Sequence, residues 1–244
     1  MSQWGFYFDQ TRCFNCKACV FACKSWNDDK RGDVSLNVPL AWIETGKYDN
    51  PSAYEALSGS TGEQNYAEYR KYHMKENWRR VTATEYGDVP PNIDVLNVSI
   101  GCNHCDEPAC VKACPMQIIE KESKFGAVLV NNEYCISCGK CKDACPWDAP
   151  QFYDPEFRSY ADADPKRPRM TKCTLCYERI SEGLKPACVA ACVGRALECG
   201  PIEELKAKYP NAVVTLENFA SDEIPSMGIY TKPNIIFKAR AKKV

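Results

Sequence analysis

Cysteine is the residue type that dominates the possible chemistry of this sequence, with 17 copies among 244 residues. A deprotonated cysteine binds soft metal ions and iron–sulfur clusters. All but one of the cysteines fall into four groups of four, and every group ends in C-x3-C. We number them along the chain: group I is Cys13, Cys16, Cys19 and Cys23, group II is Cys102, Cys105, Cys110 and Cys114, group III is Cys135, Cys138, Cys141 and Cys145, and group IV is Cys173, Cys176, Cys188 and Cys192.

Disulfides, zinc sites and iron–sulfur clusters are the three uses open to so many cysteines. Disulfide scaffolds are typically short, secreted and even in cysteine number. This chain is long, has an odd number of cysteines, and begins with neither a secretory signal nor a twin-arginine signal. We therefore expect no disulfide framework and no export address on this chain itself. Cys199, the cysteine outside the groups, is expected to be a buried structural thiol.

The spacing within the groups favours [4Fe–4S] clusters over zinc. Groups I and III have the spacing C-x2-C-x2-C-x3-C, group II has C-x2-C-x4-C-x3-C, and group IV has C-x2-C-x11-C-x3-C. The first spacing is the run of bacterial ferredoxins, whereas zinc is usually held by two separated C-x2-C pairs. Group IV alone fits a zinc site, so a zinc-stabilised interaction module is the alternative from another functional class. The sequence predicts four [4Fe–4S] clusters, as many as there are groups.

The C-x3-C endings predict that the groups exchange ligands in pairs. In two-cluster ferredoxins the fourth cysteine of each run binds the other cluster, because it lies on a helix that points away from the nearer cluster. Only 20 residues separate groups II and III, so we expect them to pair, which leaves group I to pair with group IV. The predicted ligands are Cys13, Cys16, Cys19 and Cys192 for cluster 1, Cys102, Cys105, Cys110 and Cys145 for cluster 2, Cys135, Cys138, Cys141 and Cys114 for cluster 3, and Cys173, Cys176, Cys188 and Cys23 for cluster 4.

Short strands and helices around the groups must position these thiols. We expect strands at residues 4–8, 92–100 and 125–130, and a helical turn or two after Cys16. The segment between groups I and II is expected to be a long surface insertion with little regular structure, apart from a strand at residues 78–86. After group IV we expect a helix at residues 202–209, and strands at residues 212–216 and 234–238.

The fold class that follows is α+β, with two interleaved bacterial-ferredoxin-like two-cluster modules, a long loop insertion and a C-terminal extension. The module for clusters 1 and 4 is expected at residues 1–30 plus 166–200, and the module for clusters 2 and 3 at residues 93–165. The insertion covers residues 31–92 and the extension residues 201–244.

Other functions find little support in the sequence. The formal net charge is -1, so no basic excess indicates a nucleic-acid partner. No apolar run approaches the roughly 18 residues of a membrane helix, so we expect no direct membrane span. No catalytic arrangement of residues predicts substrate chemistry.

Three polar side chains lie near the cysteine groups or between them. Two of them have two possible roles each, and the third has no role that the sequence indicates. His104 lies inside group II and is either a hydrogen-bond donor to a cluster sulfur or a loop histidine in contact with solvent or backbone. His73 has no evident partner. Lys172, which precedes Cys173, either offsets cluster charge or simply keeps the surface soluble.

Several stretches of local sequence around the groups are distinctive. They are Gly5-Phe6-Tyr7-Phe8-Asp9, Asn103-His104, Glu107-Pro108-Ala109, Pro146-Trp147-Asp148-Ala149-Pro150-Gln151, Glu182-Gly183 and Lys185-Pro186. With these stretches and the order of the four groups, roughly residues 3–30 and 93–205 resemble the iron–sulfur subunit of the dimethyl sulfoxide reductase family of molybdopterin enzymes.

The resemblance implies an electron-transfer subunit that is not catalytic alone. A large partner would hold molybdenum or tungsten on a bis-pterin cofactor. This chain would relay electrons between that partner and a quinol-linked membrane subunit or a soluble carrier. A free-standing polyferredoxin that serves several redox enzymes is the alternative.

The resemblance also implies the path of the electrons and the type of each cluster. The clusters would follow the order 1, 4, 2, 3, with cluster 1 nearest the catalytic partner. Some relatives have Trp at the second cysteine of group III and hold a [3Fe–4S] cluster there, whereas Cys138 at this position implies four cubane clusters. Relatives are often exported with a signal-bearing partner, so the extracytoplasmic face is expected, with the cytoplasm as the alternative.

Overall fold

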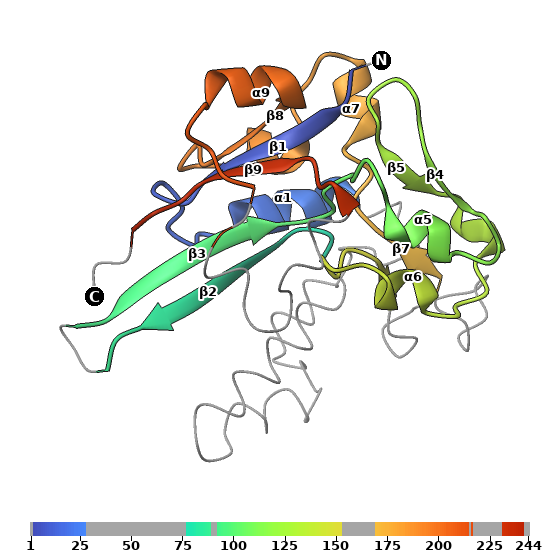
Figure 1. The fold of residues 1–244 in the computed structure, drawn as a ribbon, viewed down its shortest axis with the longest axis horizontal. Coiled ribbons are helices and arrows are strands. Elements are labelled where there is room, and N and C mark those ends of the chain that lie inside the picture. Colours follow the sequence, from blue (N-terminus) through green and yellow to red (C-terminus); the bar gives the residue numbers. More distant parts are fainter. Residues whose placement is uncertain are drawn as a thin grey trace, which may run out of the picture.

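Strand β1 (Trp4–Asp9) is the central strand of a three-stranded sheet in the computed structural model of the protein, in the order β8-β1-β9 (Figure 1). Strand β8 (Leu197–Pro201) runs antiparallel to β1, and β9 (Ile235–Lys238) runs parallel to it. The first strand of the chain is thus paired on both sides with strands from its last fifth. The structure describes residues 2–27, 77–88, 92–152, 169–214, 216 and 231–241.

The two faces of this sheet pack against different parts of the protein, because successive side chains of a strand point to opposite faces. Tyr7 and Ile236 pack with Ile202 and Leu205 of helix α9 (Ile202–Lys208), which covers one face. On the opposite face, Phe6, Phe8, Ile235 and Phe237 are almost completely buried in the main core. That core also contains most cysteines of groups I and IV, so the apolar face of the sheet supports the thiols.

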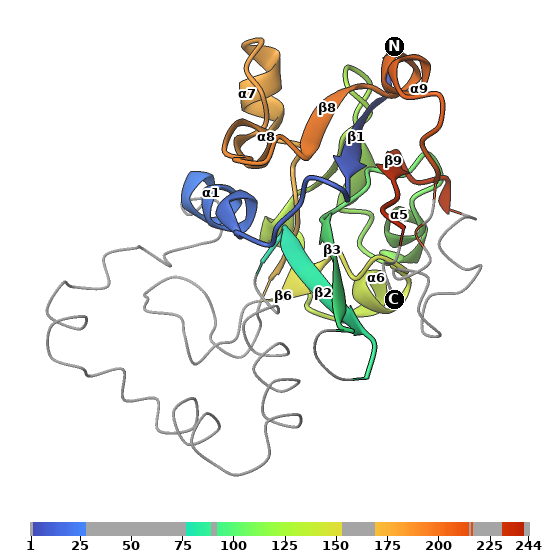
Figure 2. The ribbon, with the colours of Figure 1, turned by 90° about the vertical axis from the view of Figure 1, so that its left-hand side faces the viewer.

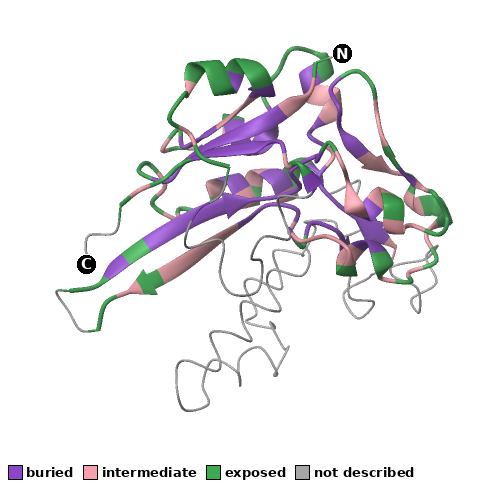
Figure 3. Ribbon diagram, in the orientation of Figure 1, coloured by how far each residue is buried: buried purple, intermediate pink, exposed green. Residues whose placement is uncertain are grey.

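A second sheet is the hairpin of β2 (Arg80–Tyr86) and β3 (Asp94–Ile100), paired from Arg80↔Ile100 to Tyr86↔Asp94. Most of β3 is buried, as Figure 3 shows, and Trp78 and Arg79 just before β2 are buried too. The end of the predicted insertion is therefore part of the core and not of the surface. The rest of the insertion, with His73, lies outside the described residues.

Short helices carry the cysteine groups. Helix α1 (Ala18–Trp26) packs against α8 (Ala187–Ala190), and α5 (Ala109–Ala113) packs against α6 (Lys140–Asp143). Figure 2 shows α1 beside α8, with α7 (Tyr177–Ser181) next to them. Small elements complete the fold: β4 (Ile119–Lys121) pairs with β5 (Val128–Val130), β6 (Gln151–Phe152) pairs with β7 (Met170–Thr171), and η2 (Asn132–Tyr134) is one 3-10 turn.

The mixture of short helices and small sheets confirms the α+β class. The strands expected at residues 4–8, 78–86, 92–100 and 234–238 and the helix at 202–209 are present within two residues. The strand expected at residues 212–216 is wrong: among the described residues of this segment, only Val213 pairs, in a single bridge to Phe237. The strand expected at residues 125–130 is limited to β5, and β4 and β8 were not expected.

No helix in the described ranges combines the length and the apolar character that crossing a membrane requires.

Candidate iron–sulfur sites

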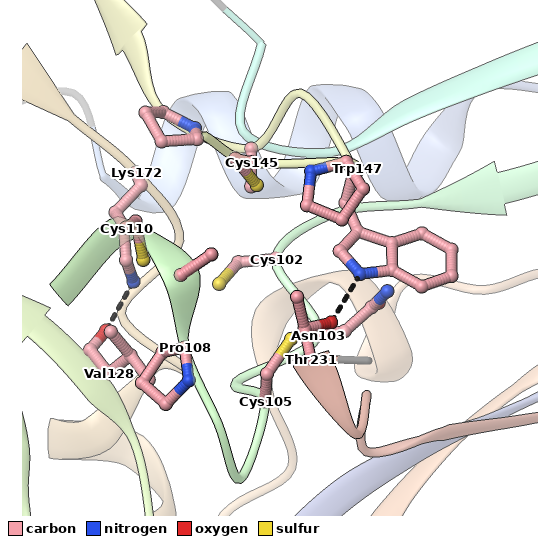
Figure 4. A pocket seen from close by; sticks show the side chains of 14 residues that line it. Cys102, Asn103, Cys105, Pro108, Cys110, Val128, Cys145, Trp147, Lys172 and Thr231 are labelled. Carbon is pink, nitrogen blue, oxygen red and sulfur yellow. Dashed lines mark hydrogen bonds between the residues drawn. The ribbon is translucent and has the colours of Figure 1, made fainter. Parts of the chain in front are cut away.

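One cavity brings together three cysteines of group II and the last cysteine of group III. Cys102, Cys105, Cys110 and Cys145 line a hollow of about 360 Å³, which includes its opening (Figure 4). We call it the Cys145 cavity, after the remote cysteine. Figure 4 shows the sulfurs of Cys102 and Cys105 near its centre, with Cys145 from above and Cys110 from the side. The loop cysteines of one group thus face the C-x3-C cysteine of another.

Two further cavities repeat this arrangement. Cys13, Cys16 and Cys19 share a hollow of about 330 Å³ with Cys192, and Cys135, Cys138 and Cys141 share one of about 310 Å³ with Cys114. We call them the Cys192 cavity and the Cys114 cavity. A zinc ion lies about 2.3 Å from each thiolate sulfur, so four thiolates around zinc leave no such hollow between them. Across the described ranges, no three His, Cys, Asp or Glu side chains are grouped to hold a single metal ion.

Cys173 of group IV lies near Cys23 of group I. Burial raises the pKa of Cys173 well above its usual value, and the charges of Cys23, Cys102 and Cys176 raise it further. The amide of Asn27 points its nitrogen at the Cys23 sulfur, 3.9 Å away. The structure therefore places cysteines of each group near cysteines of another group. Which thiol binds which cluster is a further step, taken below.

All four cysteine loops share one backbone feature. The residue before the second cysteine of each group has a left-handed φ: Asn15 (61°), His104 (44°), Ser137 (59°) and Leu175 (62°). This conformation is uncommon outside glycine, and successive N–H groups around such a residue form a concave site for negative charge. In groups III and IV the N–H of this residue donates to the sulfur of the first cysteine over 3.4 Å. The four groups differ in sequence, but each has a left-handed residue before its second cysteine, and this conformation favours thiolates.

A second repeated turn follows the last cysteine of groups II, III and IV. Three residues after it, Gln117, Asp148 and Arg195 have positive φ and donate their N–H to the carbonyl of that cysteine. Proline follows the cysteine in groups II and III but not in group IV. The turn therefore does not depend on proline.

Burial makes the free thiols poor acids. Burial, together with the charges of neighbouring cysteines, raises the pKa of Cys105 and Cys110 to about 12 and that of Cys141 to about 11. Four thiolates in one apolar hollow therefore need a positive core between them. A [4Fe–4S] cluster, held by four cysteine thiolates, meets this need. The donor set, the hollow and the burial all fit such a cluster.

The Cys145 cavity also has polar walls, most of which the sequence did not reveal. Lys172 is 1% exposed and donates to the carbonyls of Val128 and Cys173. Its burial favours charge compensation over a role in solubility. Asn103 lines the cavity, and its amide has no partner among the described residues. Thr231, from the C-terminal extension, closes the cavity opposite Lys172. Sequence reasoning missed Asn103 and Thr231, because neither follows a recognisable pattern.

His104 is completely buried, and its Nδ1 accepts the backbone N–H of Val128 over 3.0 Å. Burial and the nearby cations Lys172 and Lys121 hold the pKa of His104 well below its usual value, so the ring is neutral. This contact agrees with the interpretation of a loop histidine bound to the backbone, although solvent does not reach it. The other ring nitrogen has no partner among the described residues.

Cys199 lies in β8, opposite Phe6. The residue is half-buried, and burial followed by the charge of Cys188 raises the pKa of its thiol well above the usual value. It lines none of the three cavities described above. Cys199 is thus half-buried and not fully buried as expected, and its role as a structural thiol stays a prediction.

Comparisons with known proteins agree with the chemistry of the cavities. A family model described as "4Fe-4S dicluster domain" matches residues 93–202, and one described as "4Fe-4S binding domain" matches residues 10–26. The sequence is 35% identical to the B subunit of the anaerobic dimethyl sulfoxide reductase of Haemophilus influenzae, over 96% of this protein and 91% of that subunit.

Two other relatives extend the comparison. YnfG of Escherichia coli, described as a probable anaerobic dimethyl sulfoxide reductase subunit, is 34% identical, over 98% of this protein and 90% of that one. The formate dehydrogenase-O iron-sulfur subunit of Escherichia coli is 32% identical, over 91% of this protein and 60% of that one. The last relative is thus considerably longer than the matched region.

Proposed function

This protein belongs to the family of iron–sulfur subunits of dimethyl sulfoxide reductases and formate dehydrogenases, and from this premise we propose that it conducts electrons through four [4Fe–4S] clusters to or from a molybdopterin catalytic subunit. It binds 4Fe–4S clusters and is not catalytic by itself. The observation that carries the proposal is the Cys145 cavity, where group II and group III contribute to one four-thiol site. The clusters supply one-electron redox chemistry, and the protein supplies ligands, charge and spacing.

We assign the ligands across groups. Cluster 1 takes the four cysteines of the Cys192 cavity, cluster 2 those of the Cys145 cavity, and cluster 3 those of the Cys114 cavity. Cluster 4 takes Cys173, Cys176 and Cys188 with Cys23. The packing of α1 on α8 and of α5 on α6 supports two interleaved two-cluster modules, one at residues 1–30 plus 166–200 and one at residues 93–165.

Exchange of single cysteines tests the assignment. We expect Cys145→Ala to disturb the cluster of group II, and Cys114→Ala the cluster of group III, by Mössbauer and EPR counting on anaerobically purified protein. Cys199→Ala is the matched control and should leave all four clusters intact. If Cys145→Ala instead disturbs the cluster of its own group, the exchange of ligands is wrong. If wild-type protein holds fewer than four clusters, the count is wrong as well.

The order of the clusters is proposed as 1, 4, 2, 3. Two electrostatic interactions between thiols support this order. Cys19, a proposed ligand of cluster 1, interacts with Cys188 of cluster 4. Cys173, a proposed ligand of cluster 4, interacts with Cys102 of cluster 2. Among the predicted ligands, Cys16 and Cys138 are the two exposed cysteines. They belong to clusters 1 and 3, which are the two ends of this order, where electrons would enter and leave.

The surroundings of both exposed cysteines suit protein partners. Phe14 and Val193 are 61% and 70% exposed beside the Cys192 cavity, and Tyr134 and Ile136 are exposed beside Cys138. Apolar side chains gathered on a surface indicate an interaction site. We propose that the first surface binds the molybdenum or tungsten subunit, and the second a quinol-linked membrane subunit or a soluble carrier.

Co-purification tests the partners. The affinity-tagged protein is expected to retain a large subunit that contains molybdenum or tungsten, and the double change Phe14→Ser with Val193→Ser should release it while the clusters remain. The pair Tyr134→Ser with Ile136→Ser is the matched control for that contact. A stable, soluble protein that retains no such subunit would favour the free-standing polyferredoxin.

We also propose residence at the extracytoplasmic face through a signal-bearing partner, which cell fractionation tests against the cytoplasm.

A further inference from the structure

Arg79 carries a positive charge into the interior between groups I and IV. It is 2% exposed, and its guanidinium lies 4.6 Å from the centre of the Phe6 ring. Its Nη1 reaches the carbonyl and the hydroxyl of Ser99 only at 3.5 Å, the outer limit of a hydrogen bond. Its Nη2 has no hydrogen-bond partner among the described residues. The charge is therefore poorly satisfied by neutral groups.

No carboxylate among the described residues forms an ion pair with Arg79. Its strongest attractions are instead to four thiols: Cys188, Cys173, Cys19 and Cys23. Three of these belong to the proposed ligands of cluster 4 and one, Cys19, to those of cluster 1. At Cys19, Arg79 is the strongest charge that favours the thiolate. A buried charge without a partner is strongly unfavourable, so the arginine needs anions at these two sites.

The neighbouring Arg80 shows that burial alone does not produce this situation. Arg80 is also buried, but its guanidinium donates to the backbone carbonyls of Trp147 and Asp148, near the other module. Its donors are thus paired with neutral acceptors. Two consecutive arginines at the start of β2 therefore have different roles, and only Arg79 lies between two sets of cysteines.

We propose that Arg79 is a charge-compensating residue that raises the reduction potentials of clusters 1 and 4 together. The proposal rests on the proposed function, since it requires clusters at both sites. Reduction adds one negative charge to a cluster, and a nearby fixed cation stabilises that charge. Salt screens an interaction between buried charges much less than one between exposed charges. Arginine keeps its charge at every physiological pH, so the effect is permanent. The same cation reduces the repulsion between the two clusters when both hold an electron.

The test is an anaerobic redox titration of the holo-protein followed by EPR. Arg79→Met keeps an unbranched apolar side chain but removes the guanidinium and its charge. We expect the reduction equilibria of clusters 1 and 4 to shift at least tenfold toward the oxidised form, about 59 mV lower for a one-electron couple. Clusters 2 and 3 should keep their potentials and serve as the internal reference. Lys206→Met removes an exposed charge from α9 and is the matched control.

Arg79→Lys separates charge from packing. If charge matters, the lysine variant keeps both potentials close to wild type, while the methionine variant lowers them. If Arg79→Met does not assemble clusters 1 and 4, the iron content of the lysine variant decides: full loading supports charge compensation, and equal loss in both variants overturns it. Unchanged potentials in Arg79→Met overturn the inference as well. Absence of four clusters in the wild type would instead contradict the proposed function, so the two failures are distinct.

Discussion

The indole nitrogen of Trp147 donates a hydrogen bond to the hydroxyl of Thr231 over 3.2 Å, across 84 residues of sequence. Both residues line the Cys145 cavity (Figure 4). The Thr231 hydroxyl also interacts with the sulfur of Cys105. The C-terminal extension is therefore part of the wall of a cluster site and not an appendage to it.

Removal of this hydroxyl should destabilise the protein. Thr231→Val keeps the shape of the side chain but leaves the buried indole N–H without this acceptor, at a cost of about 1–3 kcal/mol in the free energy of unfolding. Urea titrations of anaerobic holo-protein measure the loss. Thr82→Val is the control, since the Thr82 hydroxyl reaches Val98 only at 3.5 Å, and we expect it to cost less than about 0.5 kcal/mol. Equal losses in both variants would contradict a specific role of Thr231.

The exposed Cys138 should be the ligand whose loss is best tolerated. Cys138→Ala removes one ligand at the rim of the Cys114 cavity, and we expect that cluster to lose one iron and become a [3Fe–4S] cluster. EPR of the oxidised protein should then show a new signal at low temperature. Cys199→Ala, which lies outside the proposed ligand sets, should show no such signal. Complete loss of the cluster in Cys138→Ala would contradict the expectation of a stable three-ligand site.

Two glycines with positive φ allow strain to be separated from contact. Gly126 and Gly183 have φ near +70°, where an alanine costs about 1–2 kcal/mol. A Cβ at Gly183 meets nothing within 4 Å, whereas a Cβ at Gly126 would displace the amide of Gln3. Gln3 donates to the carbonyl of Trp4 over 2.7 Å. Gly126→Ala should therefore destabilise by about 1 kcal/mol more than Gly183→Ala, as measured by urea unfolding, and equal losses would mean that Gln3 moves without cost.

Alkaline pH should weaken the three-stranded sheet through Tyr7. Burial, followed by the charge of Asp9, raises the pKa of Tyr7 to about 12. The unfolded chain releases this proton near pH 10. The stabilisation is therefore complete below about pH 10 and is lost as the pH rises toward 12. Tyr7→Phe has no proton to release at this position. Between pH 9 and 11 the free energy of unfolding of the wild type should therefore fall by on the order of 1 kcal/mol relative to that of the variant, as measured by urea unfolding at each pH. A difference between the two proteins that does not vary with pH would contradict this account.

The cysteine spacing predicted the sites better than the elements around them. The C-x3-C endings and the short segment between groups II and III led us to expect Cys145 beside group II and Cys114 beside group III, and the cavities bring these thiols together. The alternation of apolar and polar residues likewise predicted β2 and β3. The strand expected at residues 212–216 was wrong. Its pattern of apolar residues predicted pairing along the whole segment, but the described residues pair only at Val213.

Residues that reach a site from afar left no signal in the sequence. Thr231 contributes to the Cys145 cavity because the polypeptide returns beside β1, a tertiary event that no local pattern records. Arg79 left a partial signal: two adjacent arginines follow Trp78 at the start of a predicted strand, where a buried residue is more usually apolar. The pattern does not separate the two, because Arg80 pairs with neutral carbonyls whereas Arg79 lies near thiols.

The position of β1 between β8 and β9 has a consequence for biosynthesis. Neither edge of β1 can pair until residues 197–201 and 235–238 have been synthesised. Cys13, Cys16 and Cys19 likewise wait for Cys192, and the Cys145 cavity waits for Thr231. Complete walls around the Cys192 and Cys145 cavities therefore require segments that are synthesised at very different times.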